Sequence, residues 1–361
     1  MVPERLPRWP SEVGSRRWII SLAALTAMVA LSIDMSLPAQ PALASQFDVD
    51  AEDAQLTLSL FMIGFAGAQI FVGYLSDAWG RRRVILGGLT LFVIAGIACT
   101  ASPSIEVLIA FRVLQGFGAA AAPVVARAMV RDTQPATQAA AILSTMLAGL
   151  AVAPMIAPMI GGALLRVLDW RAIFATLAIT GLAMLVLANT TLTETLPVAR
   201  RTIRPSLRGL FASYAKFLAT PGTKLPALVF CVVFAGQFAY IADSPFVLMG
   251  GFGVSGNEYG LYFASTAVAL MLGSMTGGRM LRAGRPPRVM IVIGAAIVAI
   301  GGALLGIGTQ LDLGIAAFLG PMMIYFFGSG IVAPSATALA MEPAPEIAGT
   351  ASAAIGCAVM I

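Results

Sequence analysis

Long apolar runs are the feature that most restricts how this chain can fold. Ten of them come close to, or exceed, the roughly 20 residues that a helix needs to cross a bilayer. They lie at 18–37, 56–75, 84–101, 105–126, 139–165, 172–189, 225–245, 259–280, 289–309 and 313–334. Charged residues make up only 11% of the 361 residues, whereas a soluble domain carries about 25%. The chain is therefore expected to be an integral membrane protein.

A further apolar run begins near Ile347 and stops at Ile361, about 15 residues on, which is short for a span. We therefore expect the chain to be cut within an eleventh helix. Cleavage of the first run as a signal peptide is a weaker alternative. That run is longer than a typical signal core, and it contains Asp34.

Basic residues are strongly segregated between the apolar runs. If the N-terminus is cytoplasmic, the segments that return to the cytoplasm hold 19 of the 22 Lys and Arg residues. The first outer connection is acidic instead, with Asp48, Asp50, Glu52 and Asp53. Because basic loops stay inside, we predict a multi-pass protein of a bacterial inner membrane with its N-terminus in the cytoplasm. The same segregation explains the net charge of +5 by membrane topology, and it argues against a nucleic-acid partner.

The residues that many enzymes and metal sites require are scarce in this chain. It has no His, which excludes His-based metal ligation and His acid–base catalysis. Its three cysteines, Cys99, Cys231 and Cys357, lie far apart in apolar runs and follow no zinc or disulfide spacing. We therefore expect no metal, no cofactor and no enzymatic activity.

One long polar connection divides the apolar runs into two sets. The predicted organisation is an N-terminal six-helix half at 1–190, a basic cytoplasmic linker at 191–223 and a C-terminal half at 224–361. Two six-helix halves are the plan of one large class of transporters. A weak internal repeat agrees with this plan, because Gly80-Arg81 after the second run recurs as Gly284-Arg285 after the eighth.

Five segments, each at its expected place along the chain, resemble motifs of the major facilitator superfamily. GYLSDAWGRRRV at 73–84 resembles the loop between helices two and three, and RVLQGFG at 112–118 resembles the helix-four motif. GLAVAPMIAPMIGG at 149–162 resembles the helix-five motif of the drug:proton antiporters, although Ala153 and Ala157 replace glycines. DMSLPAQP at 34–41 resembles the Bcr/CflA drug-resistance branch, as does DSPFVL at 243–248.

This resemblance implies an all-helical fold of two six-helix halves, of whose twelve spans about ten and a half are present in this chain. It implies proton-coupled efflux of drugs or other small amphiphiles by alternating access. A small-molecule substrate and the proton would then be the partners of a monomer in the lipid bilayer. Three alternatives remain open: proton-coupled export or uptake of a metabolite such as a sugar or nucleoside, a polytopic membrane enzyme, and an inactive fragment.

Two ionisable residues, Asp34 and Arg112, are placed well inside apolar runs. A charge at the bilayer centre costs about 2.5–3.5 kcal/mol on insertion scales, so such residues usually face a partner or a water-filled pathway. Counting about 1.5 Å per helical residue puts both at a similar depth, on the outer side of the centre. With no His available, Asp34 is the natural carrier of a coupling proton, and the resemblance supports a coupling role for Arg112. The structural alternatives are a helix-end cap for Asp34 and a backbone clamp for Arg112.

The remaining candidate residues fall into three groups. A stabilised gate at the cytoplasmic side is expected from Gly73, Asp77, Gly80, Arg81 and Arg131, with Asp77 paired to arginines such as Arg131. The antiport helix motif is Gly149, Pro154, Pro158, Gly161 and Gly162, whose small residues allow close packing and whose prolines prevent a regular helix. Candidates for the substrate cavity are Gln115, Gln237, Tyr240 and Asp243, with an interfacial cap as the stronger reading of Asp243.

Overall fold

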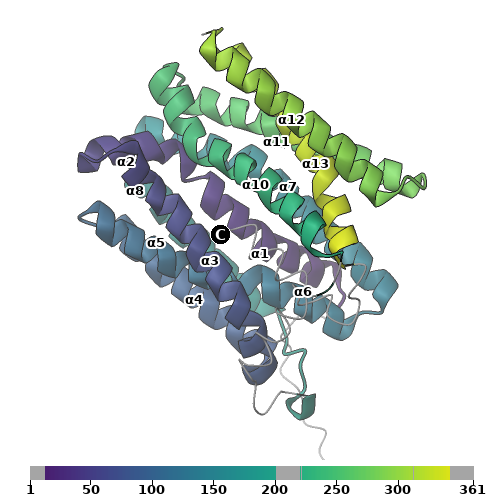
Figure 1. The fold of residues 1–361 in the computed structure, drawn as a ribbon. Coiled ribbons are helices and arrows are strands. Elements are labelled where there is room, and N and C mark those ends of the chain that lie inside the picture. The colour runs from purple at the N-terminus through teal and green to yellow at the C-terminus, as the bar shows by residue number, and fades with distance from the viewer. Residues whose placement is uncertain (1–12, 201–219, 221, 312, 342–361) are drawn as a thin grey trace, which may run out of the picture.

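The structure is a computed structural model that describes residues 13–200, 220, 222–311 and 313–341. Within these ranges every regular element is helical, as predicted (Figure 1). The expected eleventh run and most of the linker lie outside the described residues. Nine helical segments of the described chain are long and apolar enough to cross a membrane, and Val152–Val167 is a shorter apolar stretch within α7.

The helices before the linker form what we term the N-terminal bundle. Its elements are α1 (Arg16–Asp34), η1 (Leu37–Ala39), α2 (Gln40–Phe47), α3 (Ala51–Trp79), α4 (Arg81–Thr100), α5 (Ile105–Ala119), α6 (Ala121–Thr133), α7 (Ala136–Val167) and α8 (Trp170–Thr191), followed by η2 (Val198–Arg200). The fourth apolar run is thus divided into α5 and α6, which meet at Ala120.

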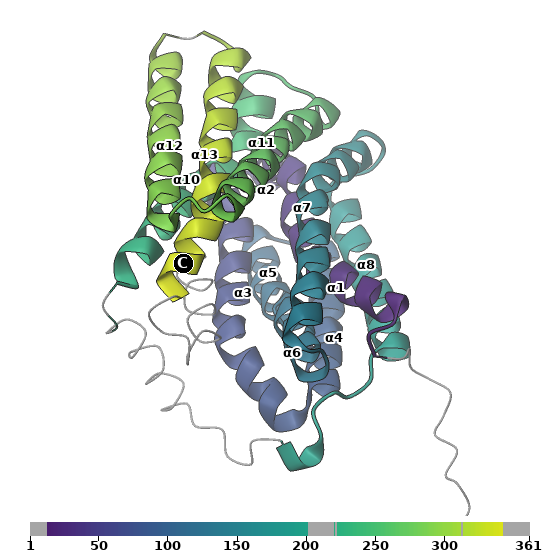
Figure 2. The ribbon, with the colours of Figure 1, turned by 90° about the vertical axis from the view of Figure 1, so that its right-hand side faces the viewer.

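The helices after the linker form the C-terminal bundle. Its described elements are α10 (Lys224–Pro245), the π-helical turn η3 (Phe246–Gly251), α11 (Gly256–Arg282), α12 (Pro287–Gln310) and α13 (Ile315–Met341). Figures 1 and 2 show α12 and α13 side by side, with α11 passing across α7 of the N-terminal bundle.

Local sequence signals explain where several helices begin and end. The Ser255 side chain and the Glu258 side chain form a reciprocal capping box at the start of α11. Gly80 separates α3 from α4 with φ of 97°, and Gly284 separates α11 from α12 with φ of 82°. Both values lie in the left-handed region that favours glycine. The weak repeat noted in the sequence therefore places two glycines in equivalent tight turns.

Small residues allow the helices to approach closely where backbones cross. A Cβ added to Gly116 of α5 would lie 2.1 Å from the Phe61 carbonyl oxygen of α3, and one on Gly64 would lie 2.3 Å from the Val113 carbonyl oxygen. Without a hydrophobic drive inside the bilayer, such close packing is a main source of helix association. The α3–α5 crossing therefore depends on glycine on both helices.

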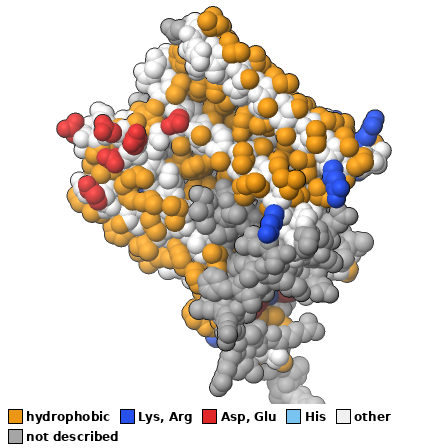
Figure 3. Space-filling view, viewed as in Figure 1, with side chains coloured by type: hydrophobic (Ala, Val, Ile, Leu, Met, Phe, Trp, Pro, Cys, Tyr) orange, Lys and Arg blue, Asp and Glu red, His pale blue; other side chains and the backbone are white. Residues whose placement is uncertain are grey.

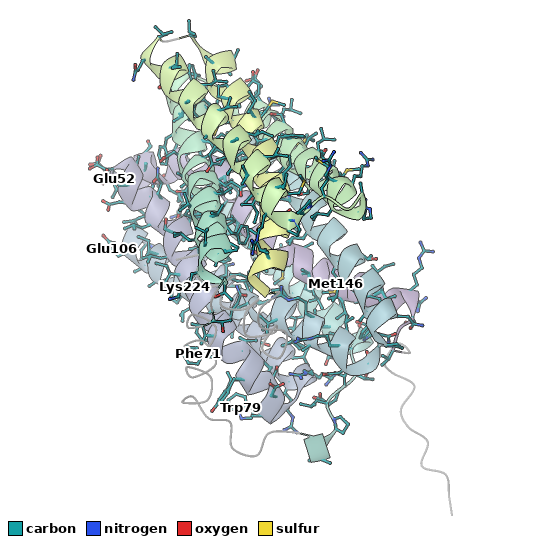
Figure 4. All side chains as sticks on the ribbon, turned by 45° about the vertical axis from the view of Figure 1, so that its right-hand side comes forward. Glu52, Phe71, Trp79, Glu106, Met146 and Lys224 are labelled. Carbon is teal, nitrogen blue, oxygen red and sulfur yellow. The ribbon has the colours of Figure 1, made fainter. Side chains whose placement is uncertain are left out.

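Charge divides the molecule into two ends. Figure 3 shows acidic side chains gathered at one end and Lys and Arg side chains toward the other, with an apolar surface between them. Figure 4 places Glu52 and Glu106 together at the first end and Trp79 toward the second. We call these the acidic end, where α3 and α5 begin, and the basic end, where α4 begins.

The two prolines of the antiport motif do not end their helix. Pro154 and Pro158 both lie inside α7, which continues from Ala136 to Val167. Each proline removes one backbone donor and clashes with the preceding turn, so the hydrogen-bond ladder is interrupted without a change of element. We expected the prolines to prevent a regular helix. In the structure α7 is continuous, and what the prolines remove is backbone hydrogen bonds within it.

We predict that Gly116→Val will destabilise the protein by about 3 kcal/mol or more, because its side chain would collide with the backbone of α3. The measurement is the thermal midpoint of the detergent-solubilised protein, followed by size-exclusion chromatography. Gly87→Val is the matched control, since a Cβ at Gly87 meets nothing within 4 Å. Equal midpoints for the two variants would contradict the proposed role of this crossing.

Candidate functional site

The Arg112 guanidinium is completely buried in the middle of the N-terminal bundle. Its Nε donates to the Thr57 carbonyl oxygen of α3 at 3.1 Å, and its Nη1 donates to Gln115 Oε1 at 2.9 Å. Its Nη2 lies 3.4 Å from both the Ser32 carbonyl oxygen and Ser36 Oγ, at the end of α1. One side chain therefore ties three helices together.

Aromatic rings complete the surroundings of this cation. The guanidinium carbon lies 4.2 Å from the centre of the Phe61 ring and 5.6 Å from that of Phe174. Such cation–π contacts contribute about 2 kcal/mol when desolvated. Among the described residues no carboxylate pairs with Arg112. Backbone carbonyls, an amide and rings therefore compensate the charge.

Gln115, a predicted residue of the substrate cavity, lies beside Arg112. It is fully buried, and its amide oxygen accepts from Arg112 one turn earlier on α5. The spacing of three residues on one helix puts the two side chains on the same face. Gln115 is therefore a partner of Arg112 in this structure, and its place in the substrate cavity stays a prediction.

Asp34 is the last residue of α1 and is 5% exposed. Its carboxylate forms no hydrogen bond and no ion pair with any described residue. Ile33 and Leu37 on either side of it pack into an apolar cluster that also contains Tyr240 and Tyr259 of the C-terminal bundle. The residues beside Asp34 therefore lie where the two bundles meet, and Asp34 forms no ion pair with Arg112.

The predicted residues Gln237 and Tyr240 both lie on α10 and are 7% and 5% exposed. The Tyr240 ring is surrounded by Phe263, Phe318 and Phe326, with ring centroids 5.2–6.1 Å away. The same cluster includes Leu58 of α3. An amide and a phenol set in aromatic surroundings are suited to an amphiphile that is mostly apolar.

The glycines of the antiport motif bring backbones into contact. A Cβ on Gly161 would lie 2.3 Å from the Met35 carbonyl oxygen, beside Asp34. One on Gly162 would lie 2.1 Å from the carbonyl oxygen of Gly256, at the start of α11. At Gly149 the nearest atom would be 3.7 Å away, an ordinary contact. The end of α7 therefore joins α1 to the C-terminal bundle at the acidic end.

Asp243 also joins the bundles there. Its Oδ1 accepts a 2.7 Å hydrogen bond from Gln55 Nε2 of α3, and both residues are accessible to solvent. The sequence placed Asp243 among the cavity candidates, with an interfacial cap as the stronger reading, and both stay predictions. In the structure Asp243 makes a contact between helices that are distant in sequence, and Phe246 is the C-terminal cap residue of α10.

At the basic end, Arg81 forms the centre of a polar cluster. It pairs with Asp77 one turn earlier and, through Nε, with Asp132 Oδ2 of α6 at 2.8 Å. Its Nη1 also donates to Ser76 Oγ at 2.6 Å. The expected partner of Asp77 was Arg131, but Arg131 is exposed and its neighbour Asp132 is the residue of α6 that faces Arg81.

Glu194 extends this cluster to the segment after α8. Its carboxylate accepts from the backbone amides of Arg81 at 2.9 Å and Arg82 at 3.3 Å. An acidic side chain at a helix start satisfies unpaired amides and complements the helix dipole. Among the described residues, these contacts hold α3, α4, α6 and the start of the linker within one bundle.

Sequence reasoning overlooked Gln55, Glu194 and the pair formed by Gln40 and Thr57. Gln40 Nε2 donates to Thr57 Oγ1 at 3.0 Å, and both residues are buried beside Arg112's backbone acceptor. A polar residue within an apolar run was available as a signal for Thr57, and Gln40 lies in the DMSLPAQP motif at 34–41. Gln55 and Glu194 lie in polar segments, where nothing in the sequence marks them.

Comparisons with known proteins agree with the motifs. Residues 22–361 match the family model of the Major Facilitator Superfamily. An uncharacterized MFS-type transporter of Bacillus subtilis, YdgK, is 35% identical over 346 residues, which cover 93% of this chain and 85% of that protein. Multidrug resistance protein D of Escherichia coli K12 is 30% identical over 342 residues, covering 94% and 84%. The bicyclomycin resistance protein homolog of Haemophilus influenzae is 29% identical over 349 residues, covering 94% and 85%.

Solved structures share the fold at lower identity. A bacterial homolog of the human lysosomal transporter Spinster, in an inward-facing and occupied conformation, superposes with a TM-score of 0.77 at 20% identity, covering 96% of this chain and 80% of that one. A D-xylose–proton symporter gives 0.73 at 18% identity, covering 96% and 88%. At these identities the likeness concerns the fold alone.

We predict that Arg112→Lys will lower the stability of the solubilised protein by about 2–4 kcal/mol. A single ammonium group cannot replace the planar fork, so buried acceptors on α1, α3 and α5 lose their donors. The check is thermal unfolding in detergent. The matched control Arg83→Lys, at an exposed position, should stay within about 0.5 kcal/mol. A lysine variant as stable as its control would show that the fork does not clamp these helices.

Proposed function

Because the chain belongs to the major facilitator superfamily and is of the Bcr/CflA type, we propose that this transporter exports drugs or similar small amphiphiles in exchange for protons. Efflux is favoured by the relatives, whose names include multidrug resistance protein D and bicyclomycin resistance protein homolog. The observation that carries the proposal is the burial of Asp34, without a bonded partner, where the two bundles meet.

The proton would bind to Asp34. Burying an ionised carboxylate without a partner is costly, whereas its neutral form is tolerated. The present state, in which Asp34 is buried, therefore suits the protonated form. Access of water from the acidic end would allow the carboxylate to ionise and to take up a proton again, and neutralisation would favour closure of that end.

The substrate would lie between the bundles, near Gln237 and Tyr240. The aromatic side chains around Tyr240 offer apolar contact, and the amide of Gln237 offers one donor and one acceptor. This region also touches Asp34 through Ile33 and Leu37. Substrate binding and protonation would then favour opposite states of one conformational equilibrium, which is the basis of exchange.

Arg112 would act by positioning. Its bonds to α1, α3 and Gln115 fix the helix that carries Asp34, and it makes no ion pair with Asp34 in this state. A buried cation held this rigidly keeps the helix ends in register while the bundles move. We assign Arg112 to coupling in this indirect sense.

The basic-end cluster would hold the opposite closure. The Asp77 side chain is 51% exposed although it pairs with Arg81. It can therefore meet the C-terminal bundle when the basic end closes. Gly73, Gly80, Arg81 and Arg131 would shape this inner gate. The helix-five motif would supply the contact on which the bundles rock, through Gly161 and Gly162.

We further propose that the acidic end faces the periplasm and the basic end the cytoplasm, with the N-terminus inside. The bias of Lys and Arg toward one set of connections supports this orientation. Each half, at 1–190 and 224–361, would move as a unit about the linker at 191–223, and a single chain would form the transport pathway.

The function is tested with purified protein in proteoliposomes carrying an imposed pH gradient. The panel combines amphiphilic antibiotics and dyes with a sugar and a nucleoside. We expect uphill movement of amphiphiles only, and we expect Asp34→Asn to reduce it to background while leaving downhill exchange measurable. Asp53→Asn, an exposed acid at the acidic end, is the matched control and should transport normally.

Two results of this experiment would overturn the proposal. Undiminished uphill transport by Asp34→Asn would remove Asp34 as the proton carrier. Accumulation of the sugar or the nucleoside instead of the amphiphiles would reassign the substrate to a metabolite.

Orientation has its own test in intact cells. In a chain without native cysteines, Glu52→Cys should react with a membrane-impermeant thiol reagent, whereas Arg83→Cys should react only after permeabilisation. Both positions are exposed, so the difference reports on the side of the membrane. The reverse pattern would invert the proposed topology.

A further inference from the structure

The acidic end of α10 is bonded in two directions. Asp243 accepts from Gln55 of α3, which belongs to the other bundle, at 2.7 Å. The next residue, Ser244, shares a 3.0 Å hydrogen bond with the Tyr259 hydroxyl of α11. Two consecutive residues therefore connect α10 with the opposite bundle and with its own neighbour.

The two bonds differ in their surroundings. The Gln55–Asp243 bond is open to solvent, whereas Ser244 and Tyr259 are completely buried. A solvent-exposed hydrogen bond is easily exchanged for bonds to water, but a buried one cannot be lost without leaving unsatisfied groups. The outer bond is thus suited to open and close, and the inner bond is suited to transmit a displacement.

Tyr259 connects this region with the proposed proton carrier. Its ring lies in the apolar cluster that contains Leu37 and borders Ile33, the residues around Asp34. The two bonds from Gln55 to Asp243 and from Ser244 to Tyr259 therefore lead to the apolar cluster that also holds the neighbours of Asp34.

The helix changes character just beyond the bonded residues. Pro245 ends α10, and the π-helical turn η3 follows with two glycines at 250 and 251. Proline lacks a backbone donor, and π-turns are wider than the regular helix. The bonded dipeptide is therefore next to a backbone that can shift without disturbing the remainder of α10.

We propose that Gln55, Asp243, Ser244 and Tyr259 form an outer latch, which holds the acidic end closed and links that closure to the state of Asp34. Asp243 is the residue that crosses between the bundles. Tyr259 is a positioning residue: its hydroxyl holds Ser244, next to Asp243, and its ring lies in the cluster beside Asp34. The proposal rests on the alternating access proposed above.

The latch is tested by the reactivity of a cysteine placed beneath it. Leu58 is fully buried in the cluster between the bundles, so Leu58→Cys should react slowly with a membrane-impermeant thiol reagent added to intact cells. Native cysteines are replaced first. Loss of one hydrogen bond worth about 1 kcal/mol should raise the open population, and hence the labelling rate, about fivefold.

We expect this increase in both Asp243→Ala and Gln55→Ala, with no further increase when they are combined. Glu52→Ala is the matched control, because it removes an exposed acid of the same end that bonds to no described residue of the other bundle. Its rate should equal that of the parent. Equal rates in Asp243→Ala, Gln55→Ala and the parent would refute the latch, and so would additive increases in the double variant.

The link to Asp34 is tested by a second pair of substitutions. Asp34→Asn removes a buried charge that opposes closure, and it should slow labelling of Leu58→Cys about threefold or more. Tyr259→Phe retains the ring and removes the bond to Ser244, so in that background Asp34→Asn should slow labelling less than it does in the parent. An undiminished effect would refute the role of Tyr259.

These measurements need neither substrate nor a pH gradient. A chain that shows the labelling pattern but transports no amphiphile would overturn the proposed efflux and support the latch. A chain that transports amphiphiles normally, with all labelling rates equal, would support the proposed efflux and refute the latch.

Discussion

The bonding of the Arg112 guanidinium is the interaction on which the N-terminal bundle depends. A cation buried inside a membrane protein has no water to bond to, so each of its donors must find a partner in the protein. The partners come from α1, α3 and α5, and two of them are backbone carbonyls. A backbone carbonyl cannot rotate away, so these partners fix the relative height of the helices. The position of Asp34 at the end of α1 follows from the same bonds.

Much of the architecture could be predicted from the apolar runs, because a bilayer imposes one length and one backbone conformation on every span. The ten complete runs correspond to helices of the described chain, and the glycines at 80 and 284 mark equivalent turns. The division of the fourth run at Ala120 left no such mark. A helix that bends between two apolar segments keeps the same composition throughout, so neither periodicity nor hydropathy reveals it.

The candidate site was predictable in its charged residues and poorly predictable in its pairings. Asp34 and Arg112 are conspicuous because charges are rare in spans, yet depth alone cannot tell that they form no ion pair. The partner of Arg81 turned out to be Asp132, one residue from the predicted participant Arg131, because a shift of one position turns a side chain by about 100° around a helix. Gln55 meets Asp243 across 188 residues, and no local pattern encodes such a contact.

The contact between Gly162 and Gly256 has a mechanical consequence. Where two helices pack through side chains, the side chains of one helix lie in grooves of the other. Rotation of either helix must first separate these side chains. Here backbone lies against backbone, so the surfaces are smooth. Helix α11 can therefore rotate against α7 at this contact without first disengaging side chains. The energy barrier to reorientation of the two helices would then come mainly from side-chain contacts around this point, and little from the glycine contact itself.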